Sequence, residues 1–157
     1  MKFCFENKRV LITGSSRGIG LETATMFAKA GAKVAVHYNS NDTIAKSALN
    51  SLEGTGHILI KGDLFLEETP LFLIQQVIEK LGGIDIVVNN AGIFEEHPPS
   101  GTSYEEWKEK WDRTIKINLI APVDITFCAV KEMQKNGGGK VINISSRGAF
   151  RGEPDAP

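Results

Sequence analysis

The sequence has little of what marks several common protein classes. Its two cysteines, Cys4 and Cys128, lie far apart and follow no pairing pattern, so a disulfide-stabilised secreted scaffold is not expected. Its three histidines lack the spacing of metal ligands, so no metal site is predicted. No apolar run is long enough to cross a membrane, and residues 1–5 acquire charge too soon for a signal peptide. These absences predict a cytoplasmic protein with no membrane partner.

An excess of charge of one sign is also lacking. The chain carries 18 Lys and Arg residues against 19 Asp and Glu residues, a formal net charge of −1, and no basic cluster. This balance argues against nucleic acid as the main partner. What is present is ordinary for a globular protein, because 157 residues, 41% of them hydrophobic, suffice for one domain with a sizeable core.

Strand and helix signals alternate along the chain. Short apolar runs predict five strands: Arg9–Thr13, Lys33–His37, His57–Lys61, Ile84–Asn89 and Val141–Ser145. Amphipathic stretches predict helices between them: one reaching Ala30, one from a cap at Asp42 to Leu52, Leu71–Leu81, and a long one from Ser103 to Gln134 with a bend at Pro122. Repeated β–α–β units with right-handed crossovers predict an α/β fold with a doubly wound parallel sheet. The ligand crevice of such a sheet lies at the carboxyl ends of its strands.

A glycine-rich turn, Gly14-Ser15-Ser16-Arg17-Gly18-Ile19-Gly20, follows the first predicted strand. Gly14 supplies the positive φ of a sharp turn, and Gly18 and Gly20 let the backbone approach a ligand and the helix pack close to the strand. The free N–H groups at the start of the helix would face a phosphate. A tight turn that binds no ligand is the alternative for this segment taken alone.

Five segments, in this order, resemble the short-chain dehydrogenase/reductase family: Thr13–Gly20, Asp63, Asn89-Asn90-Ala91-Gly92, Asn118 and Ser145-Ser146. Within the family, the chain resembles the branch of 3-oxoacyl-acyl-carrier-protein reductases and sugar or alcohol dehydrogenases. The resemblance extends over essentially all of residues 1–157. With the alternating pattern, it predicts a single Rossmann-type NADP(H)-binding domain with strand order 3-2-1-4-5. It also implies a homo-oligomer for a full-length chain.

The family's reaction is hydride transfer between a nicotinamide and a small-molecule carbonyl or secondary alcohol. The predicted cofactor-binding residues are Gly14, Ser16, Arg17, Gly18, Ile19, Gly20, Tyr38, Asn39, Asp63, Leu64, Asn90, Ala91 and Gly92. By resemblance, Asp63 contacts the adenine, and Asn90-Ala91-Gly92 packs beneath the cofactor. Taken alone, the first would be only an acid ending a strand and the second only a turn.

Arg17 favours NADP(H) over NAD(H). A cation at a helix N-terminus is opposed by the helix dipole by about 0.3–1 kcal/mol, and an anionic partner reverses that sign. An arginine can accommodate the 2′-phosphate of NADP, whereas NAD-specific forms place an acid at the end of the second strand. Here that strand runs into His37-Tyr38-Asn39-Ser40, with no carboxylate before Asp42. A merely solvated Arg17 is the alternative.

Asn118 and Ser146 are the predicted catalytic residues. At helical spacing, Asn118 shares a face with Trp107 and Trp111, and Pro122 has no N–H to bond its carbonyl. The resemblance implies that Asn118 holds a water in a proton relay to a catalytic lysine; a proline kink without a catalytic role is the alternative. By resemblance, Ser146 binds the substrate oxygen and Ser145 is structural. Nucleophilic hydrolysis is not favoured, because the serines lie in no Gly-x-Ser-x-Gly turn and no histidine follows them.

The pair Tyr104 and Lys108 has the Tyr-x-x-x-Lys spacing that the family uses for catalysis, but it precedes Asn118 instead of following the serine strand. We interpret Ser103-x-x-Glu106 as a capping box and this pair as structural. The family's tyrosine and lysine are expected beyond Pro157, so we predict that residues 1–157 alone reduce no carbonyl compound and leave their last strand as an apolar edge. A truncated, non-catalytic nucleotide-binding or regulatory module is the competing hypothesis.

Overall fold

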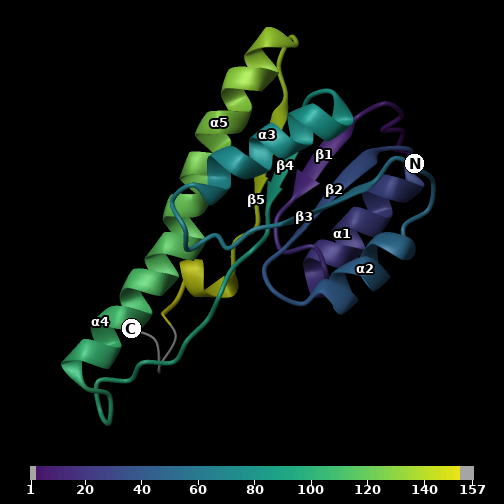
Figure 1. The fold of residues 1–157 in the computed structure, drawn as a ribbon. Coiled ribbons are helices and arrows are strands. Elements are labelled where there is room, and N and C mark those ends of the chain that lie inside the picture. Colours follow the sequence, from purple (N-terminus) through teal and green to yellow (C-terminus); the bar gives the residue numbers. More distant parts are fainter. Residues whose placement is uncertain (1–2, 153–157) are drawn as a thin grey trace.

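The computed structural model describes residues 3–152 and confirms the predicted α/β class. Its twisted sheet has the order β3-β2-β1-β4-β5, and every neighbouring pair is parallel (Figure 1). The strands are β1 (Arg9–Ile12), β2 (Lys33–Tyr38), β3 (Ile58–Lys61), β4 (Ile86–Asn89) and β5 (Lys140–Asn143). The order reverses between β1 and β4, so a crevice is expected at their carboxyl ends.

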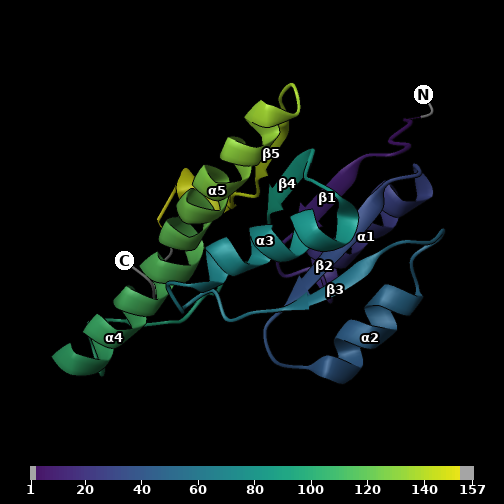
Figure 2. The same cartoon turned by 45° about the horizontal axis from the view of Figure 1, so that its top comes forward.

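Helices cover both faces of the sheet (Figures 1 and 2). They are α1 (Gly18–Lys29), α2 (Asp42–Asn50), α3 (Thr69–Leu81), α4 (Tyr104–Ile115) and α5 (Ala121–Lys135). Alternation along β1 divides the core, because Val10 and Ile12 pack with α1 whereas Leu11 packs with α3 and α5. Each fully buried aliphatic side chain of this kind stabilises the fold by about 1.5–3 kcal/mol. Helix α4 projects beyond the sheet and has no buried residue.

The cap of α2 differs from the prediction. Asn41, not Asp42, is the N-cap, because its backbone is extended and its Oδ1 accepts a hydrogen bond from the Ile44 N–H at 3.0 Å. Asp42 is the first helical residue, and the helix ends at Asn50, before the predicted Leu52. The displaced cap leaves the Asp42 carboxylate available for other partners.

The long helix contains a π-helical turn, Lys116–Ile120, between α4 and α5. The Ala121 N–H bonds to the Lys116 carbonyl, five residues back. The irregularity therefore comes just before Pro122, where the sequence predicts a bend. Because proline has no N–H and its ring crowds the preceding turn, a wider turn admits it without ending the helix. The predicted capping box is confirmed, with Ser103 and Glu106 bonding each other's backbone N–H groups.

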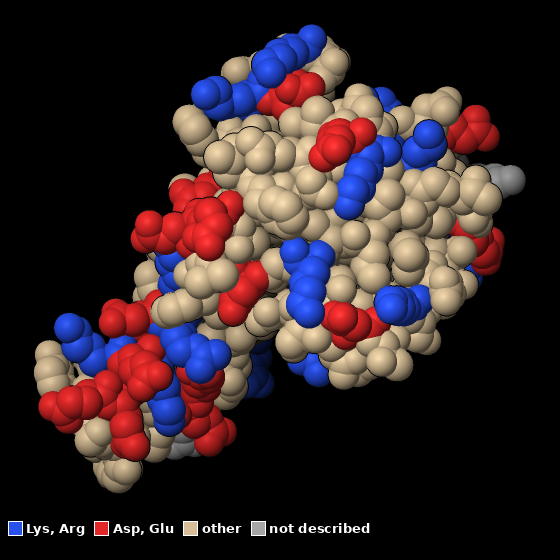
Figure 3. All heavy atoms as spheres, viewed as in Figure 1, with Lys and Arg blue, Asp and Glu red and all other residues tan. Residues whose placement is uncertain are grey.

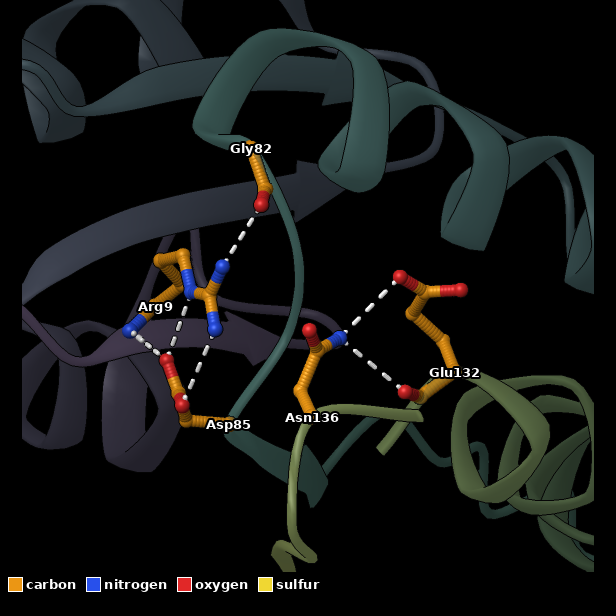
Figure 4. A network of polar contacts seen from close by, with 5 residues as sticks. All are labelled: Arg9, Gly82, Asp85, Glu132 and Asn136. Atoms are coloured by element: carbon orange, nitrogen blue, oxygen red, sulfur yellow. Dashed lines mark hydrogen bonds and ion pairs between the residues drawn. The ribbon is translucent and has the colours of Figure 1, made fainter. Parts of the chain in front are cut away.

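Arg9 and Asp85 close the amino end of the sheet (Figure 4). Arg9 Nε and its backbone N–H both donate to Asp85 Oδ2, at 2.7 and 2.8 Å, and Arg9 Nη1 donates to the Gly82 carbonyl at 2.6 Å. These bonds from Arg9 hold the pKa of Asp85 below its usual value. This network joins the start of β1 to the residue before β4.

Strand β5 lies at the edge of the described sheet, as the sequence predicts. The Ile142 side chain on β5 and that of Ile144 just after it are both exposed. Between residues 3 and 152, no helix combines the length and apolar character that a membrane span requires.

Candidate functional site

A cavity of about 590 Å³ opens at the carboxyl ends of β1, β2, β3 and β4. All thirteen residues predicted to bind the cofactor line it: Gly14, Ser16, Arg17, Gly18, Ile19, Gly20, Tyr38, Asn39, Asp63, Leu64, Asn90, Ala91 and Gly92. They come from the ends of four separate strands, so the parallel sheet brings together segments that are distant in sequence. Their convergence on one cavity is a finding, whereas their binding of a cofactor stays a prediction.

The glycine-rich turn lies against the segment that follows β4. Gly14 has a φ of +63°, and a Cβ added to it would lie 2.9 Å from the Ala91 Cα. A Cβ on Gly20 would lie 2.5 Å from the Asn90 Nδ2 and 2.6 Å from the Gly14 carbonyl oxygen. Gly18 has a φ of +56° and open space where its Cβ would be. Gly14 and Gly20 therefore allow close packing beneath the cavity, and Gly18 supplies a backbone conformation.

Thr13 and Asn90 join the exits of β1 and β4. The Thr13 Oγ1 accepts hydrogen bonds from the backbone N–H groups of Asn90 and Ala91, both at 3.0 Å. The Asn90 Nδ2 donates to the Thr13 and Gly14 carbonyls at 2.8 and 3.2 Å. These four bonds fix the floor of the cavity, because each satisfies a polar group that is shielded from water.

The amino end of α1 opens onto the cavity. Arg17 is the N-cap in extended conformation, and its side chain makes no cap hydrogen bond to the described residues. The first turn of the helix contains no acidic residue. The backbone N–H groups of Gly18, Ile19 and Gly20 thus carry the positive end of the helix dipole at the cavity wall. The exposed Arg17 side chain adds a full positive charge.

Asp42 is the first carboxylate after β2, and Lys61 neutralises it. The Lys61 Nζ lies 3.0 Å from Asp42 Oδ1. Hydrogen bonds from Lys61 and then Tyr38 hold the pKa of Asp42 below its usual value. The wall formed by Tyr38, Asn39 and Ser40 accordingly presents no unpaired carboxylate of its own to the cavity.

Asn118 lies in the π-helical turn and holds the segment after Gly92. Its Oδ1 accepts from the Ile93 N–H at 2.9 Å, and its Nδ2 donates to the Ile93 carbonyl at 2.8 Å. Both ends of its amide are therefore paired with one backbone residue. Its Oδ1 would lie 3.4 Å from a Cβ on Gly92, so Asn118 borders the cavity without lining it.

Ser146 lies past the end of β5 and does not line the cavity. It is exposed and caps a short 3-10 turn, Arg147–Ala149, with its Oγ 3.4 Å from the Gly148 nitrogen. Tyr104 is also exposed, at the start of α4, with its ring stacked against Trp107. It borders a second hollow of about 710 Å³, which shares Asn39, Asp63, Ile93 and Ile117 with the first.

Several cavity residues were missed by the sequence analysis. They are His37, Ser40, Asn41, Ile44, Gly62, Ile93 and Ile117. Gly62 and Ile93 adjoin predicted residues, so extending each predicted segment by one residue would have found them. Ile117 comes from the long helix, and no local pattern places it at the cavity. Among the described residues, no group of three or more His, Cys, Asp or Glu side chains could hold a metal ion.

The chemistry of the cavity suits an elongated anionic ligand. One wall offers helix N–H groups and Arg17, which favour phosphate groups. The other walls contain Tyr38, Leu64 and Ile93, with Asp63 as a hydrogen-bond acceptor. The uncapped helix start offers N–H groups to a pyrophosphate, and the close approach at Gly20 lets the helix pack against the strand as in dinucleotide-binding turns. The residues present therefore fit a nicotinamide dinucleotide.

The model of the short chain dehydrogenase family matches residues 8–157. An uncharacterized oxidoreductase of Thermotoga maritima is 36% identical over 152 residues, which are 96% of this chain and 58% of the relative. Dehydrogenase/reductase SDR family member 4 of Homo sapiens is 36% identical over 152 residues, with 94% of this chain and 52% of the relative covered. The chain thus spans a little more than half the length of these curated relatives.

Two solved structures are similar to nearly the whole chain. A short chain dehydrogenase from Burkholderia cenocepacia J2315, in complex with NADP, has a TM-score of 0.82 at 29% identity, with 94% of this chain and 59% of that protein covered. A putative short-chain alcohol dehydrogenase from Sinorhizobium meliloti 1021 has a TM-score of 0.85 at 31% identity, with 99% of this chain and 61% of that protein covered.

Proposed function

The chain belongs to the short-chain dehydrogenase family, and from this membership we propose that it is part of an NAD(P)(H)-dependent oxidoreductase. The reaction is hydride transfer between a nicotinamide and a small carbonyl or secondary alcohol compound. When bound, the nicotinamide supplies or accepts the hydride, and the protein supplies orientation and the proton. The observation that carries the proposal is the uncapped start of α1, facing a cavity at the switch point of the sheet.

NADP(H) is the preferred cofactor in this proposal. Arg17 supplies a charge-assisted contact to the 2′-phosphate, while Lys61 and Tyr38 occupy the nearby Asp42 carboxylate. The NADP-bound relative from Burkholderia cenocepacia supports the same choice. Asp63 and Leu64 contact the adenine, and Asn90, Ala91 and Gly92 lie beneath the rest of the dinucleotide.

Titration calorimetry with NADPH and NADH tests this preference. We expect NADPH to bind more tightly, and Arg17→Ala to remove most of the difference, roughly a ten- to hundredfold change, with little effect on NADH. Lys29→Ala is the matched control, because it removes the same charge from the last turn of the same helix. Equal affinities of the wild type for the two cofactors would contradict the preference.

Ser146 and Asn118 are assigned the family's roles in this proposal. Ser146 binds the substrate oxygen, and Asn118 positions a water through its backbone carbonyl while its side chain holds the Ile93 backbone. Neither side chain is a competent proton donor at neutral pH. A polypeptide of residues 1–157 should therefore bind NADPH without oxidising it in the presence of ketones. NADPH oxidation by this polypeptide, abolished by Tyr104→Phe, would identify Tyr104 as the acid instead.

Self-association forms the last part of the proposal. Four apolar side chains at four-residue spacing are exposed along α4, the π-helical turn and α5: Ile115, Leu119, Val123 and Phe127. An exposed apolar stripe of this kind favours burial against another surface. Analytical ultracentrifugation of Leu119→Lys against the wild type tests the self-association.

Nucleic acid is not a proposed partner, since on the face in Figure 3 Lys and Arg lie interspersed with Asp and Glu, most densely over α4.

A further inference from the structure

His37 lies buried between two walls of the proposed cofactor cavity. The residue is 2% exposed and stands next to last in β2. Its Nδ1 accepts a hydrogen bond from the Gly14 N–H at 3.0 Å, and its Nε2 lies 3.0 Å from the Gly62 carbonyl oxygen. A carbonyl oxygen only accepts, so the proton is on Nε2 and the ring is neutral. The ring thus joins the first glycine of the turn to the residue before Asp63.

The His37 backbone reinforces this connection. The Ser15 N–H donates to the His37 carbonyl at 2.9 Å, and the His37 N–H donates to Ser15 Oγ at 3.2 Å. Ser15 Oγ in turn donates to the Ile12 carbonyl at 2.7 Å. The start of the glycine-rich turn is therefore fixed to β2 through backbone and side chain, whereas the loop that begins at Gly62 reaches the turn through the His37 ring.

Building on the proposed function, we propose that His37 is a positioning residue for the dinucleotide. Its ring sets the separation between the glycine-rich turn, which holds the pyrophosphate, and the Asp63 segment, which holds the adenine. Both walls must contact the same ligand at hydrogen-bond distance, so a shift of one wall weakens the contacts that the ligand can make with both at once. An apolar side chain at position 37 would leave the Gly14 N–H and the Gly62 carbonyl without their partner.

His57 offers a matched comparison near the amino end of the sheet. Its Nδ1 accepts from the Val34 N–H at 3.1 Å, and its Nε2 lies 2.8 Å from the Glu53 carbonyl oxygen. It too joins two segments through their backbone groups. Neither Val34 nor Glu53 lines the cavity. Replacement of His57 therefore reports the cost of losing such a bridge without any effect on the cavity walls.

The test compares NADPH affinity, measured by titration calorimetry, and melting temperature in the full-length protein. The variants are His37→Leu, His37→Asn, His37→Gln and His57→Leu. Asparagine places its oxygen near the position of Nδ1, and glutamine places its amide nitrogen near that of Nε2, so each keeps one of the two contacts. We expect the Kd for NADPH to rise roughly tenfold in His37→Leu and by less in the two amides. His57→Leu should lower the melting temperature and leave the Kd unchanged.

An unchanged Kd in His37→Leu, or an equal rise in His57→Leu, would overturn the positioning role alone. If His37→Leu does not fold, a wild-type Kd for NADPH in both His37→Asn and His37→Gln would also overturn the positioning role. Absence of NADPH binding by the wild type is a separate outcome, which would refute the proposed function and the role of His37 together.

Discussion

At the amino end of the sheet, Arg9 and Asp85 bond to each other and to nearby backbone, with side chains only 21% and 18% exposed (Figure 4). At the carboxyl end, Lys61 and Asp42 form a pair whose side chains are 55% and 56% exposed. Buried polar groups at that end, such as His37, hold backbone turns in place while the first N–H groups of α1 receive no cap. The polar groups of Arg9 and Asp85 at the amino end are thus paired within the protein, whereas at the carboxyl end the first N–H groups of α1 stay available to a ligand.

The largest expected effect comes from adding one methyl group at Gly20, beneath the cavity at the carboxyl end of the sheet. Gly20→Ala would place a Cβ 2.5 Å from the Asn90 Nδ2 and 2.8 Å from the Ser15 Cα, contacts that force backbone to move. We expect about 3 kcal/mol less free energy of unfolding and loss of NADPH binding. Gly18→Ala is the control, because its Cβ meets nothing and only its φ of +56° opposes the change, at about 1–2 kcal/mol. Urea denaturation compares the two variants, and NADPH titration follows Gly20→Ala alone because Gly18 itself lines the cavity. Equal losses of unfolding free energy in the two variants would refute the close-approach argument.

The second effect is a loss of unfolding free energy in acid that arises from His37, at the carboxyl end of the sheet. Burial lowers the pKa of His37 to about 4 from 6.5, against weaker opposing effects of the Gly62 carbonyl and Asp63. The unfolded chain therefore binds a proton before the folded one does. The stabilisation by neutral His37 is complete above pH 6.5 and is lost as the pH falls toward 4, amounting to about 3 kcal/mol over that window.

The difference in unfolding free energy between wild type and His37→Asn measures this loss. It should be largest at pH 7 and should shrink by about 2–3 kcal/mol at pH 4.5. A pH-independent difference would mean that His37 titrates normally in the folded protein.

The third effect is confined to the amino end. Arg9→Ala removes three side-chain hydrogen bonds, two of them to Asp85. Because the pair is partly exposed, we expect a loss of about 2 kcal/mol of unfolding free energy. NADPH affinity should not change, since neither residue lines the cavity. Arg9→Leu combined with Asp85→Leu should recover part of the stability. A weakened NADPH affinity in Arg9→Ala would show that the two ends are coupled.

The sequence alone predicted most of the carboxyl end because its residues follow apolar runs directly, and parallel strands end at one edge. The glycine-rich turn was found in this way, whereas Asp63 and Asn90 were singled out by the resemblance to the family. Ile117 could not be found, because its position depends on how the long helix packs on β4. The sequence also assigned the cap of α2 to Asp42, since Asn41 and Asp42 are both good caps and only the backbone conformation decides between them. Pro122 indicated an irregular helix without revealing that the π-helical turn precedes it.

The smallest effect concerns the exposed pair at the carboxyl end. An ion pair as exposed as Lys61 and Asp42 is screened by water and adds little to stability, so Lys61→Met should barely change the unfolding free energy. Its effect on the proposed cofactor preference should be clearer, because an Asp42 carboxylate without its lysine then repels the 2′-phosphate of the proposed cofactor. We expect NADPH to bind about two- to fivefold more weakly at low salt, with NADH unchanged. Adding Asp42→Asn should restore NADPH affinity, and 0.5 M salt, at roughly a 4–5 Å screening length, should mask the difference. Equal weakening of both cofactors would mean that Lys61 supports the cavity wall and has no part in discriminating the 2′-phosphate.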